Sequence, residues 1–526
     1  MHKSTPSAGK SHLIFLLITA VTLVTAVFLM LWYHGCFLPG WISWKNSSCE
    51  IIPSDSELPV TICLQNRHLT ISRDDQMIFE TPDNYKIQDF QWGDINSDSK
   101  PELLLLCWKI GTYGEHRPFW VEKNDHRWSQ HIFIYQWDAG NITPLWMASD
   151  IGMEVQDWRY DNHGYLILLD RNEQLSSWAW LSWGLEQVDT EVTFLAAGDV
   201  IIHEPIFQYG LSQGNFNFLY ENVADTIHSA DIAVMNQETI YTSIPSHYSD
   251  FPRFGTPLLA GEAVEAAGFD VVTAANNHAL DQGMEGIDTT YEFYQDRDIL
   301  CLGIEPSPTD HNTIEESPTR DDTPYQIIRR KRIRFALLNY TYGLNGLPLP
   351  EEQPDAVHTL YDEDRVRADI RAAKEAADLV IVFVHWGTEY ETQPDEQETY
   401  WADVFLQEGV DAVIGTHPHV LQPYEWMTGE DGHRMLVYYS LGNFISAQDT
   451  LERVVGGMAE FKVEITLDGC EITQAQLLPV ITHQSEGRYT AYLLKDYTEE
   501  LAAKHRLGVT LEDLLQYADR ILPVQQ

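Results

Sequence analysis

The sequence predicts an α/β fold of two sheets with flanking helices, preceded by a transmembrane helix and a small all-β domain. A charge-free apolar run lies near the N-terminus, and a tryptophan-rich region of short β segments follows it. From about residue 190 strands and helices alternate, and the late β-only segments indicate a second sheet packed on the first. With 526 residues and a hydrophobic share of 44%, the chain is long and apolar enough for two or three domains.

The chain is strongly acidic. It carries 33 Lys and Arg against 79 Asp and Glu, a formal net charge of −46. Such a surface repels phosphate backbones and anionic membranes, so we expect no nucleic-acid partner.

The first element is the apolar run Leu13–Tyr33, which has the length of a membrane-spanning helix. Lys3 and Lys10 precede it, which favours a cytoplasmic segment 1–12, a signal anchor 13–33 and a single-pass membrane protein with its bulk outside the cytoplasm. A weaker alternative is lipidation of Cys36 after a lipoprotein-type cleavage. Cys36 and Cys49 are close enough in sequence to pair, whereas the other four cysteines are expected as free thiols.

Residues 49–188 are predicted to form the all-β domain, because short strands alternate with turn residues and no helical periodicity intervenes. The clearest strands are Val60–Leu64, His68–Ser72, Met77–Glu80, Leu103–Trp108, His131–Trp137 and Tyr165–Leu169.

One loop of this region, GDINSDSKPELLLL, is rich in oxygen ligands. Its candidate calcium ligands are Asp94, Asn96, Asp98 and Glu102, spaced so that a tight loop brings several of them onto one cation. The stretch resembles the calcium-binding loop of FG-GAP repeats, but it occurs once. The alternative is an Asx-rich turn without an ion.

The region after Asp189 alternates strands and helices. Its predicted strands are Val192–Ala197, Ile232–Asn236, Val271–Ala275, Phe335–Tyr340, Leu379–His385, Ala412–Gly415, Met435–Ser440 and Ala459–Leu467. Its predicted helices are Gly261–Gly268, Met284–Gln295, Asp364–Ala376 and Glu396–Gly409. A C-terminal helical extension is expected over 483–526.

Polar residues gather at the ends of these strands, where open α/β sheets bind ligands. They are Asp199 with His203, Asn236 to Glu238, Asn276 to His278, His385, and His417 with His419. Any one of these histidines is explained by a hydrogen bond at a strand end, but their joint placement is not. Imidazoles with carboxylate and amide oxygens make a pocket for one or two divalent ions such as Mn, Fe or Zn, and two ions about 3.5–4 Å apart can clamp a displacement centre. Since no Gly-x-Ser-x-Gly elbow is present, serine hydrolysis competes poorly.

Six motifs in order carry a family resemblance over residues 191–482. They include FLAAGDVIIH, MNQET, ANNHALDQG, FVHWGTEY, VIGTHPHVLQPYE and YYSLGNF. This pattern resembles the CapA family of capsule and poly-γ-glutamate biosynthesis proteins, whose fold is related to the calcineurin-like metallophosphoesterases. The resemblance departs from phosphoesterases proper, which have Asp-x-His at the first strand, because His203 follows Asp199 by four residues.

The resemblance implies roles for individual residues. The implied metal ligands are Asp199, Glu238, Asn277, His385, His417 and His419, with Asp199 as the bridging or first-site ligand. His278 is implied to protonate a leaving group or steady the transition state, and Asp281 to orient it. Arg253 and Asn276 are candidates for contact with an anionic substrate, although a surface salt bridge explains Arg253 equally well.

The favoured function is a membrane-anchored CapA-type protein for synthesis, export or trimming of an anionic surface polymer such as poly-γ-glutamate, acting through a metal-dependent hydrolase-like site. A membrane polymer synthase is an expected partner. Two alternatives stay open: an extracytoplasmic phosphoesterase, and a non-catalytic assembly factor that binds the polymer.

Overall fold

The computed structural model describes residues 8–53, 58–74, 76–114, 119, 121–123, 125–138, 140–161, 163–308 and 323–521. They form two compact units, one of Met1–Asp189 with Ile465–Gly469 and the other of Thr190–Glu464 with Cys470–Gln526. Of the predicted cytoplasmic segment 1–12, residues 1–7 lie outside this description.

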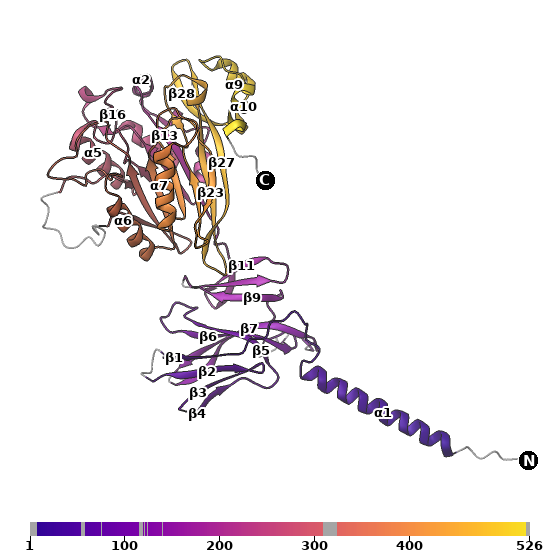
Figure 1. Cartoon of the computed structure of the whole chain (residues 1–526). Helices are drawn as coiled ribbons and strands as arrows, with labels where there is room; N and C mark the ends of the chain where they lie inside the picture. The colour runs from indigo at the N-terminus through magenta and orange to yellow at the C-terminus, as the bar shows by residue number, and fades with distance from the viewer. Residues whose placement is uncertain are drawn as a thin grey trace, which may run out of the picture. The chain divides into compact units, whose positions relative to one another are not determined.

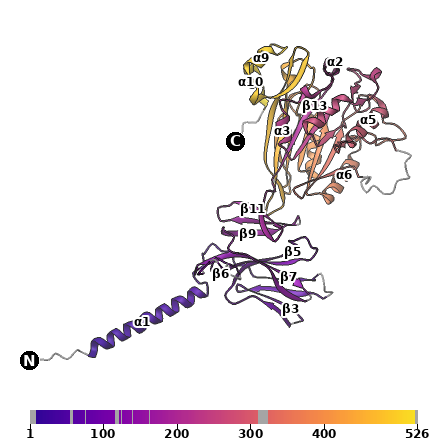
Figure 2. The same cartoon turned by 180° about the vertical axis from the view of Figure 1, so that it is seen from behind.

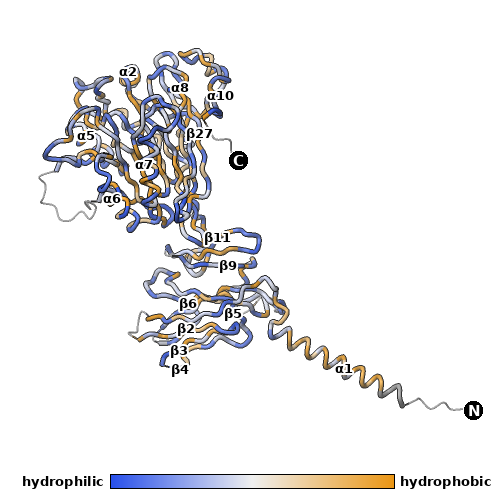
Figure 3. The backbone as a smooth tube through the Cα atoms, in the orientation of Figure 1, coloured by the Kyte–Doolittle hydropathy of each residue, from blue (hydrophilic) through white to orange (hydrophobic). Residues whose placement is uncertain are grey.

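Helix α1 (Ala8–Tyr33) contains the predicted apolar run Leu13–Tyr33. This run has 21 residues, and its most apolar part is not buried against the rest of the chain. Figure 3 shows the helix as hydrophobic along this run. Its length and composition are those of a membrane-spanning helix, and a signal sequence shares them.

The rest of the first unit consists of three four-stranded antiparallel sheets, which confirms the predicted all-β region (Figure 1). The strands are β1 (Ser47–Ile51), β2 (Val60–Gln65), β3 (His68–Arg73) and β4 (Gln76–Glu80); β5 (Lys86–Gly93), β6 (Glu102–Ile110), β7 (Trp128–Asp138) and β8 (Asn141–Met147); β9 (Val155–Tyr160), β10 (Tyr165–Asp170), β11 (Leu175–Leu181) and β12 (Gly184–Val188).

Strand β6 is the centre of this unit's core. Its leucines face both sides: Leu103 and Leu105 belong to one buried cluster, and Leu104 and Leu106 to another. A strand covered on both faces explains why its sequence is a continuous apolar run instead of an alternation. All six cysteines of the chain are free thiols, so the structure does not pair Cys36 with Cys49.

The first sheet of the second unit is mixed. Its order is β18-β17-β14-β13-β26-β27-β28, with β25 also paired to β13. The bounds are β13 (Val192–Val200), β14 (Ile232–Gln237), β17 (Val271–Thr273), β18 (Leu300–Leu302), β25 (Asn443–Ile445), β26 (Val455–Ile465), β27 (Cys470–Ser485) and β28 (Arg488–Leu493). The strands β13, β14, β17 and β18 are parallel, so their carboxyl ends lie at one edge.

The second sheet has the order β19-β20-β21-β22-β24-β23. The bounds are β19 (Gln326–Arg330), β20 (Ile333–Thr341), β21 (Leu379–His385), β22 (Ala412–Thr416), β23 (Tyr424–Thr428) and β24 (Arg434–Tyr438). Its four inner strands are parallel.

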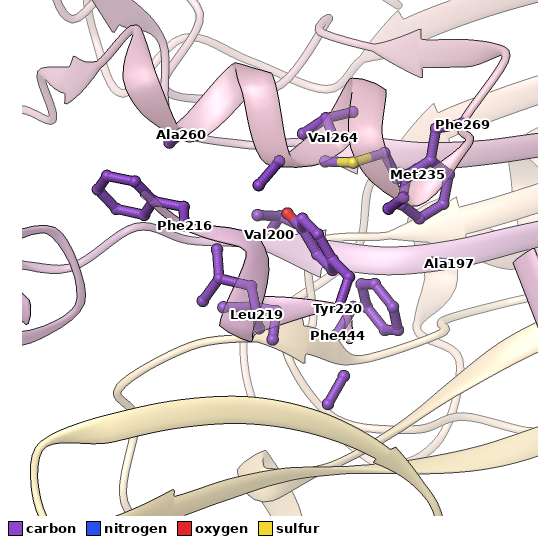
Figure 4. Packing of buried hydrophobic residues seen from close by; sticks show 14 of the residues in the cluster. Ala197, Val200, Phe216, Leu219, Tyr220, Met235, Ala260, Val264, Phe269 and Phe444 are labelled. Atoms are coloured by element: carbon purple, nitrogen blue, oxygen red, sulfur yellow. The ribbon is translucent and has the colours of Figure 1, made fainter. Parts of the chain in front are cut away.

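Helices flank the two sheets (Figures 1 and 2). α2 (Glu204–Gln213), α3 (Ala224–His228) and α4 (Leu259–Ala267) contribute to the core of the first sheet, and Figure 4 shows Ala260 and Val264 of α4 beside Val200 and Met235. α6 (Glu363–Ala376) and α7 (Glu396–Gln407) cover the second sheet. The remaining elements are β15 (Tyr241–Thr242), β16 (Thr256–Pro257), α5 (Gly283–Gln295), α8 (Leu451–Val454), α9 (Glu499–Lys504), α10 (Leu511–Ile521) and the 3-10 turns Asn217–Leu219, Pro245–His247 and Leu494–Asp496.

A cluster of phenylalanines joins the two sheets. The ring of Phe194 on β13 stacks on that of Phe461 on β26 with centroids 4.7 Å apart. The same ring also contacts those of Phe335 and Phe383 in the second sheet, with centroids 6.4 and 6.3 Å apart. The two sheets therefore pack face to face, which confirms the predicted α/β arrangement of two sheets with flanking helices.

The C-terminal region differs from the predicted helical extension 483–526. Strands β27 and β28 continue to Leu493, and the helices that follow are the short α9 and α10. Gly508 lies between them with φ +66°, a left-handed conformation that suits glycine in the connecting turn. Residues 522–526 lie outside the described residues.

Phe194→Ala tests whether the phenylalanine cluster holds the sheets together. Phe194 is fully buried, so its truncation leaves a cavity and should lower the free energy of unfolding by about 3–5 kcal/mol. Urea denaturation followed by circular dichroism measures the change. Leu515→Ala, on a residue that is 43% exposed, is the matched control and should change stability by less than about 1 kcal/mol. Equal effects of the two substitutions would contradict this assignment of the core.

Candidate metal centre

The polar strand ends of both sheets meet in one place. Asp199 is the last residue but one of β13, Glu238 follows β14, and Asn277 lies four residues beyond β17. From the second sheet, His385 ends β21, and His417 and His419 follow β22. Because each of these strands belongs to a parallel set, the carboxyl ends of the two sheets present their side chains to one another.

These side chains form two overlapping groups of three ligands. One group is Glu238, His385 and His417, and the other is Asp199, Glu238 and His419, with all ligand atoms of a group within 4.8 Å of one another. Glu238 belongs to both. Glu238 is thus the carboxylate common to the two groups, and Asp199, which the resemblance implies as the bridging or first-site ligand, belongs to the second.

Asp199 is held by neighbours from two segments. Its Oδ2 lies 3.1 Å from His419 Nδ1 and accepts a hydrogen bond from the backbone N–H of His417 at 3.3 Å. Its Oδ1 accepts from Asn236 Nδ2 at 2.8 Å. These bonds fix the carboxylate between β14 and the loop that carries His417 and His419.

Glu238 is buried without a hydrogen-bond partner. Its exposed fraction is 1%, and neither carboxylate oxygen has a partner among the described residues. The closest imidazole nitrogens are those of His419 at 3.6 Å and His385 at 3.8 Å, both measured to Oε1. Burial, and then the charge of Asp199, raise the pKa of Glu238 well above its usual value. A dry carboxylate of this kind requires positive charge.

The histidines do not supply this charge, but they are suited to bind a cation that does. Burial and the neighbouring imidazoles lower the pKa values of His385 and His417, which favours the neutral form that binds metal. In the described residues His417 Nδ1 is buried with no partner. His417 and His419 also adopt φ angles of 104° and 58°, in the left-handed region that non-glycine residues avoid. Such strain is characteristic of functional sites.

The donor set fits divalent ions. Three buried atoms have no hydrogen-bond partner among the described residues: both carboxylate oxygens of Glu238 and Nδ1 of His417. Bound metal ions would satisfy all three. Asn277 adds an amide oxygen, which lies 3.1 Å from His385 Nε2 on the side of the first group. The mixed nitrogen and oxygen ligands suit Mn, Fe or Zn.

His278 and Asp281 form a pair beside the ligands. His278 Nδ1 lies 2.7 Å from Asp281 Oδ2, which also accepts a hydrogen bond from the backbone N–H of Phe254 at 2.7 Å. The ring packs edge-on against Phe254 at 4.7 Å. Because Nδ1 is hydrogen-bonded to Asp281, Nε2 is the ring nitrogen available for proton transfer. It lies 3.5 Å from Asn345 Nδ2.

Other predicted residues lie differently. Asn276 is buried and holds the turn itself, since its amide bonds the carbonyl of Gln237 and the N–H of His278. Arg253 is exposed and makes no described contact with the ligands. His203 belongs to neither ligand group, and its Nδ1 instead accepts from the N–H of Ala447.

The candidate calcium loop is satisfied by its own backbone. Asp94 accepts from the N–H groups of Asp98 and Ser99, and Asp98 from that of Lys100. Glu102 is buried and accepts from the N–H of Ile95, and burial raises its pKa to about 7. This is the geometry of the Asx-turn alternative.

Sequence reasoning did not select Tyr342, Asn345 and Tyr390. The ring of Tyr342 lies 4.5 Å from that of His417, and the ring of Tyr390 lies 6.1 Å from that of His419. The sequence does indicate two of them, because Tyr342 and Asn345 lie two and five residues after the predicted strand Phe335–Tyr340. The same strand-end rule that found the ligands applies there.

The buried carboxyl group of Glu398 helps to connect the loop after β21 with the loop after β22. Glu398, at the start of α7, is fully buried and accepts from the side-chain amide of Gln422 at 3.3 Å. That amide also donates to the carbonyl of Glu391 at 3.1 Å, in the loop after His385. Burial, and then the charge of Asp395, raise the pKa of Glu398 to about 7.

Fold and site together define a two-sheet α/β protein with a carboxylate and histidine cluster for divalent ions. Residues 193–448 match the model of the family described as bacterial capsule synthesis protein PGA_cap. This domain is thus similar to the capsule synthesis family to which the sequence resemblance pointed.

Two relatives accord with this assignment. The capsule biosynthesis protein CapA of Bacillus anthracis is 32% identical over 192 residues, 36% of this chain and 42% of that protein. The PGA biosynthesis protein CapA of Bacillus subtilis (strain 168) is 32% identical over 183 residues, 34% of this chain and 43% of that protein. The chain thus spans less than half the length of these relatives.

Solved structures with a similar chain include the NAD nucleotidase of Haemophilus influenzae, at 12% identity and a TM-score of 0.34, covering 64% of each chain. The calcineurin-like phosphoesterase YfkN of Bacillus subtilis has 13% identity and a TM-score of 0.32, covering 63% of this chain and 96% of that chain. Scores this low carry no conclusion about activity.

Glu238→Gln tests the shared ligand. It keeps the size of the side chain and removes the charge common to both groups, so we expect the affinity for Mn²⁺ to fall by more than about tenfold. Elemental analysis of the full chain in detergent, after dialysis against Mn²⁺, measures the bound metal. Glu389→Gln, on an exposed residue near the same centre, is the control and should keep the wild-type metal content. Wild-type metal content in Glu238→Gln would refute the shared-ligand role.

Glu398 predicts a pH dependence of stability. Its folded pKa of about 7 lies above the unfolded value, so the folded state holds the proton more tightly and loses stability as the pH rises from about 4.5 to 7. Glu398→Gln removes this loss. We expect the variant to gain on the order of 2–3 kcal/mol relative to wild type between pH 4.5 and pH 8. Denaturation curves at both pH values measure it, and Glu396→Gln, exposed in the same turn, should show no such gain.

Proposed function

We propose that this chain is a membrane-anchored, extracytoplasmic hydrolase that acts on an anionic surface polymer such as poly-γ-glutamate during its synthesis, export or trimming. The observation that carries the proposal is the buried, unpartnered Glu238 shared by two histidine groups, with the His278–Asp281 pair beside them. The similarity of residues 193–448 to a capsule synthesis family supports the polymer as substrate class.

Membrane anchoring is supported by α1. Its apolar side chains are exposed along the whole of Leu13–Tyr33, and they are stabilised by a lipid environment. Trp32 and Tyr33 at its C-terminal end, with Trp41 nearby, are of the type that favours the membrane interface. A polymer synthase in the same membrane is the partner we propose.

The chemistry follows from the residues at the site. Divalent ions held by Asp199, Glu238 and the three histidines would supply Lewis-acid activation of an acyl or phosphoryl group and of water. The chain's own contribution to proton transfer is His278. Asp281 accepts a hydrogen bond from Nδ1 and orients the ring, so that Nε2 is the atom that would pass a proton to the leaving group.

The same geometry serves an amide or a phosphoester, so substrate class is decided by experiment. Full-length protein in detergent, loaded with Mn²⁺, is incubated in parallel with poly-γ-glutamate and with bis(p-nitrophenyl) phosphate. Shortening of the polymer supports the proposal. Turnover of the phosphodiester alone would favour an extracytoplasmic phosphoesterase, and no turnover of either would favour a binding factor.

His278→Ala separates catalysis from assembly. We expect kcat to fall about 10²- to 10⁴-fold, because a general acid is removed, while the metal content stays at the wild-type value. His228→Ala, on an exposed histidine of α3, is the matched control and should leave turnover unchanged. Undiminished turnover in His278→Ala would remove His278 from the mechanism.

A further inference from the structure

A guanidinium lies at the mouth of the metal centre. Arg453, in α8, has its Cζ 3.5 Å from the centroid of the Tyr390 ring. Tyr390 in turn lies against His419, with ring centroids 6.1 Å apart. One aromatic ring therefore separates Arg453 from a member of the second ligand group.

The backbone holds this arrangement from both sides. Asn443, which pairs with Asp199 in the β13–β25 register, donates from its side-chain amide to the carbonyl of Arg453 at 2.9 Å. The N–H of Tyr390 donates to the carbonyl of Pro418, between the two histidines, at 2.7 Å. Tyr390 also adopts a φ of 69°, unusual for a bulky residue. The pair is thus tied to the same segments that carry the ligands.

The Arg453 side chain has no carboxylate within 4.0 Å among the described residues, and its described side-chain contact is the one with Tyr390. Several guanidiniums of the unit are paired with carboxylates, as in Arg297 with Glu265, Arg334 with Asp378, and Arg371 with Glu408. Stacking on a ring orients the guanidinium and leaves the N–H groups at its edge available.

The two ligand groups have different aromatic neighbours. Tyr342 lies against His417 of the first group, whereas Tyr390, which carries Arg453 on its ring, lies against His419 of the second. Burial, and then the charges of the neighbouring exposed Glu389 and of Glu238, raise the pKa of the Tyr390 hydroxyl. A chain whose scissile bond reaches the centre would place a neighbouring group against Arg453.

We propose that Arg453, held on Tyr390, binds an anionic group adjacent to the scissile bond and selects polyanionic chains over neutral ones. The inference rests on the proposed function, because it assigns the substrate's charge at the same site. A guanidinium binds a carboxylate or a phosphate through two parallel hydrogen bonds, so the shared chemistry is a planar or tetrahedral oxyanion.

Binding to three synthetic oligomers tests the proposal. They are a γ-linked glutamate hexamer, the same hexamer with its free carboxylates converted to amides, and a glycerol phosphate hexamer. The full chain in detergent, loaded with Mn²⁺, is titrated with each by calorimetry. We expect wild type to bind an anionic hexamer at least about tenfold more tightly than the neutral one. Arg453→Gln should abolish the preference with unchanged metal content, and Arg453→Lys should restore part of it.

Arg434→Gln, on an exposed arginine that stacks on Trp426 at the start of β24, is the matched control and should keep the preference. An Arg453-dependent preference for the glutamate hexamer identifies a carboxylate as the anion, and one for the glycerol phosphate hexamer alone identifies a phosphate. Wild type without any preference, or Arg453→Gln with the wild-type preference, overturns the inference. Because binding is measured without turnover, protein that shows the preference and never cleaves would refute the hydrolytic function and leave this inference standing.

Discussion

The burial of Glu238 without a hydrogen bond is the constraint on which the rest of the second unit depends. An ionised carboxylate taken out of water with no compensation costs several kcal/mol at least, and such groups are retained where a cation offsets the cost. The neighbouring imidazoles do not supply that charge, because burial keeps His385 and His417 neutral. The carboxylate and histidine cluster therefore has the chemistry to hold divalent ions.

The two-sheet architecture is what makes this concentration of ligands possible. Parallel strands place their carboxyl ends at one edge, and the phenylalanine cluster around Phe194 sets two such edges against each other. Asp199 lies five residues beyond Phe194 on the same strand. The packing that stabilises the sandwich thus also fixes the position of a ligand.

Much of this could be predicted from sequence. The strand-end rule located Asp199, Glu238, Asn277 and the three histidines, because buried parallel strands are apolar runs that end abruptly at polar residues. Which carboxylate is shared could not be predicted, since it depends on side-chain distances across two sheets. Arg453 was missed for a similar reason: it belongs to a short helix and reaches the centre only through the ring of Tyr390. The long strand β27 was missed because its first half is half-buried and mixed in polarity.

The order of the ligands along the chain has a consequence for how the protein matures. Asp199 and His419 touch across 220 residues of sequence, so no partial domain contains a complete group around Asp199. The ions can enter only after nearly the whole domain has folded. If, as proposed, the chain crosses a membrane before it folds, the supply of metals outside the cytoplasm would decide which ion fills the centre, whatever the relative affinities inside the cell.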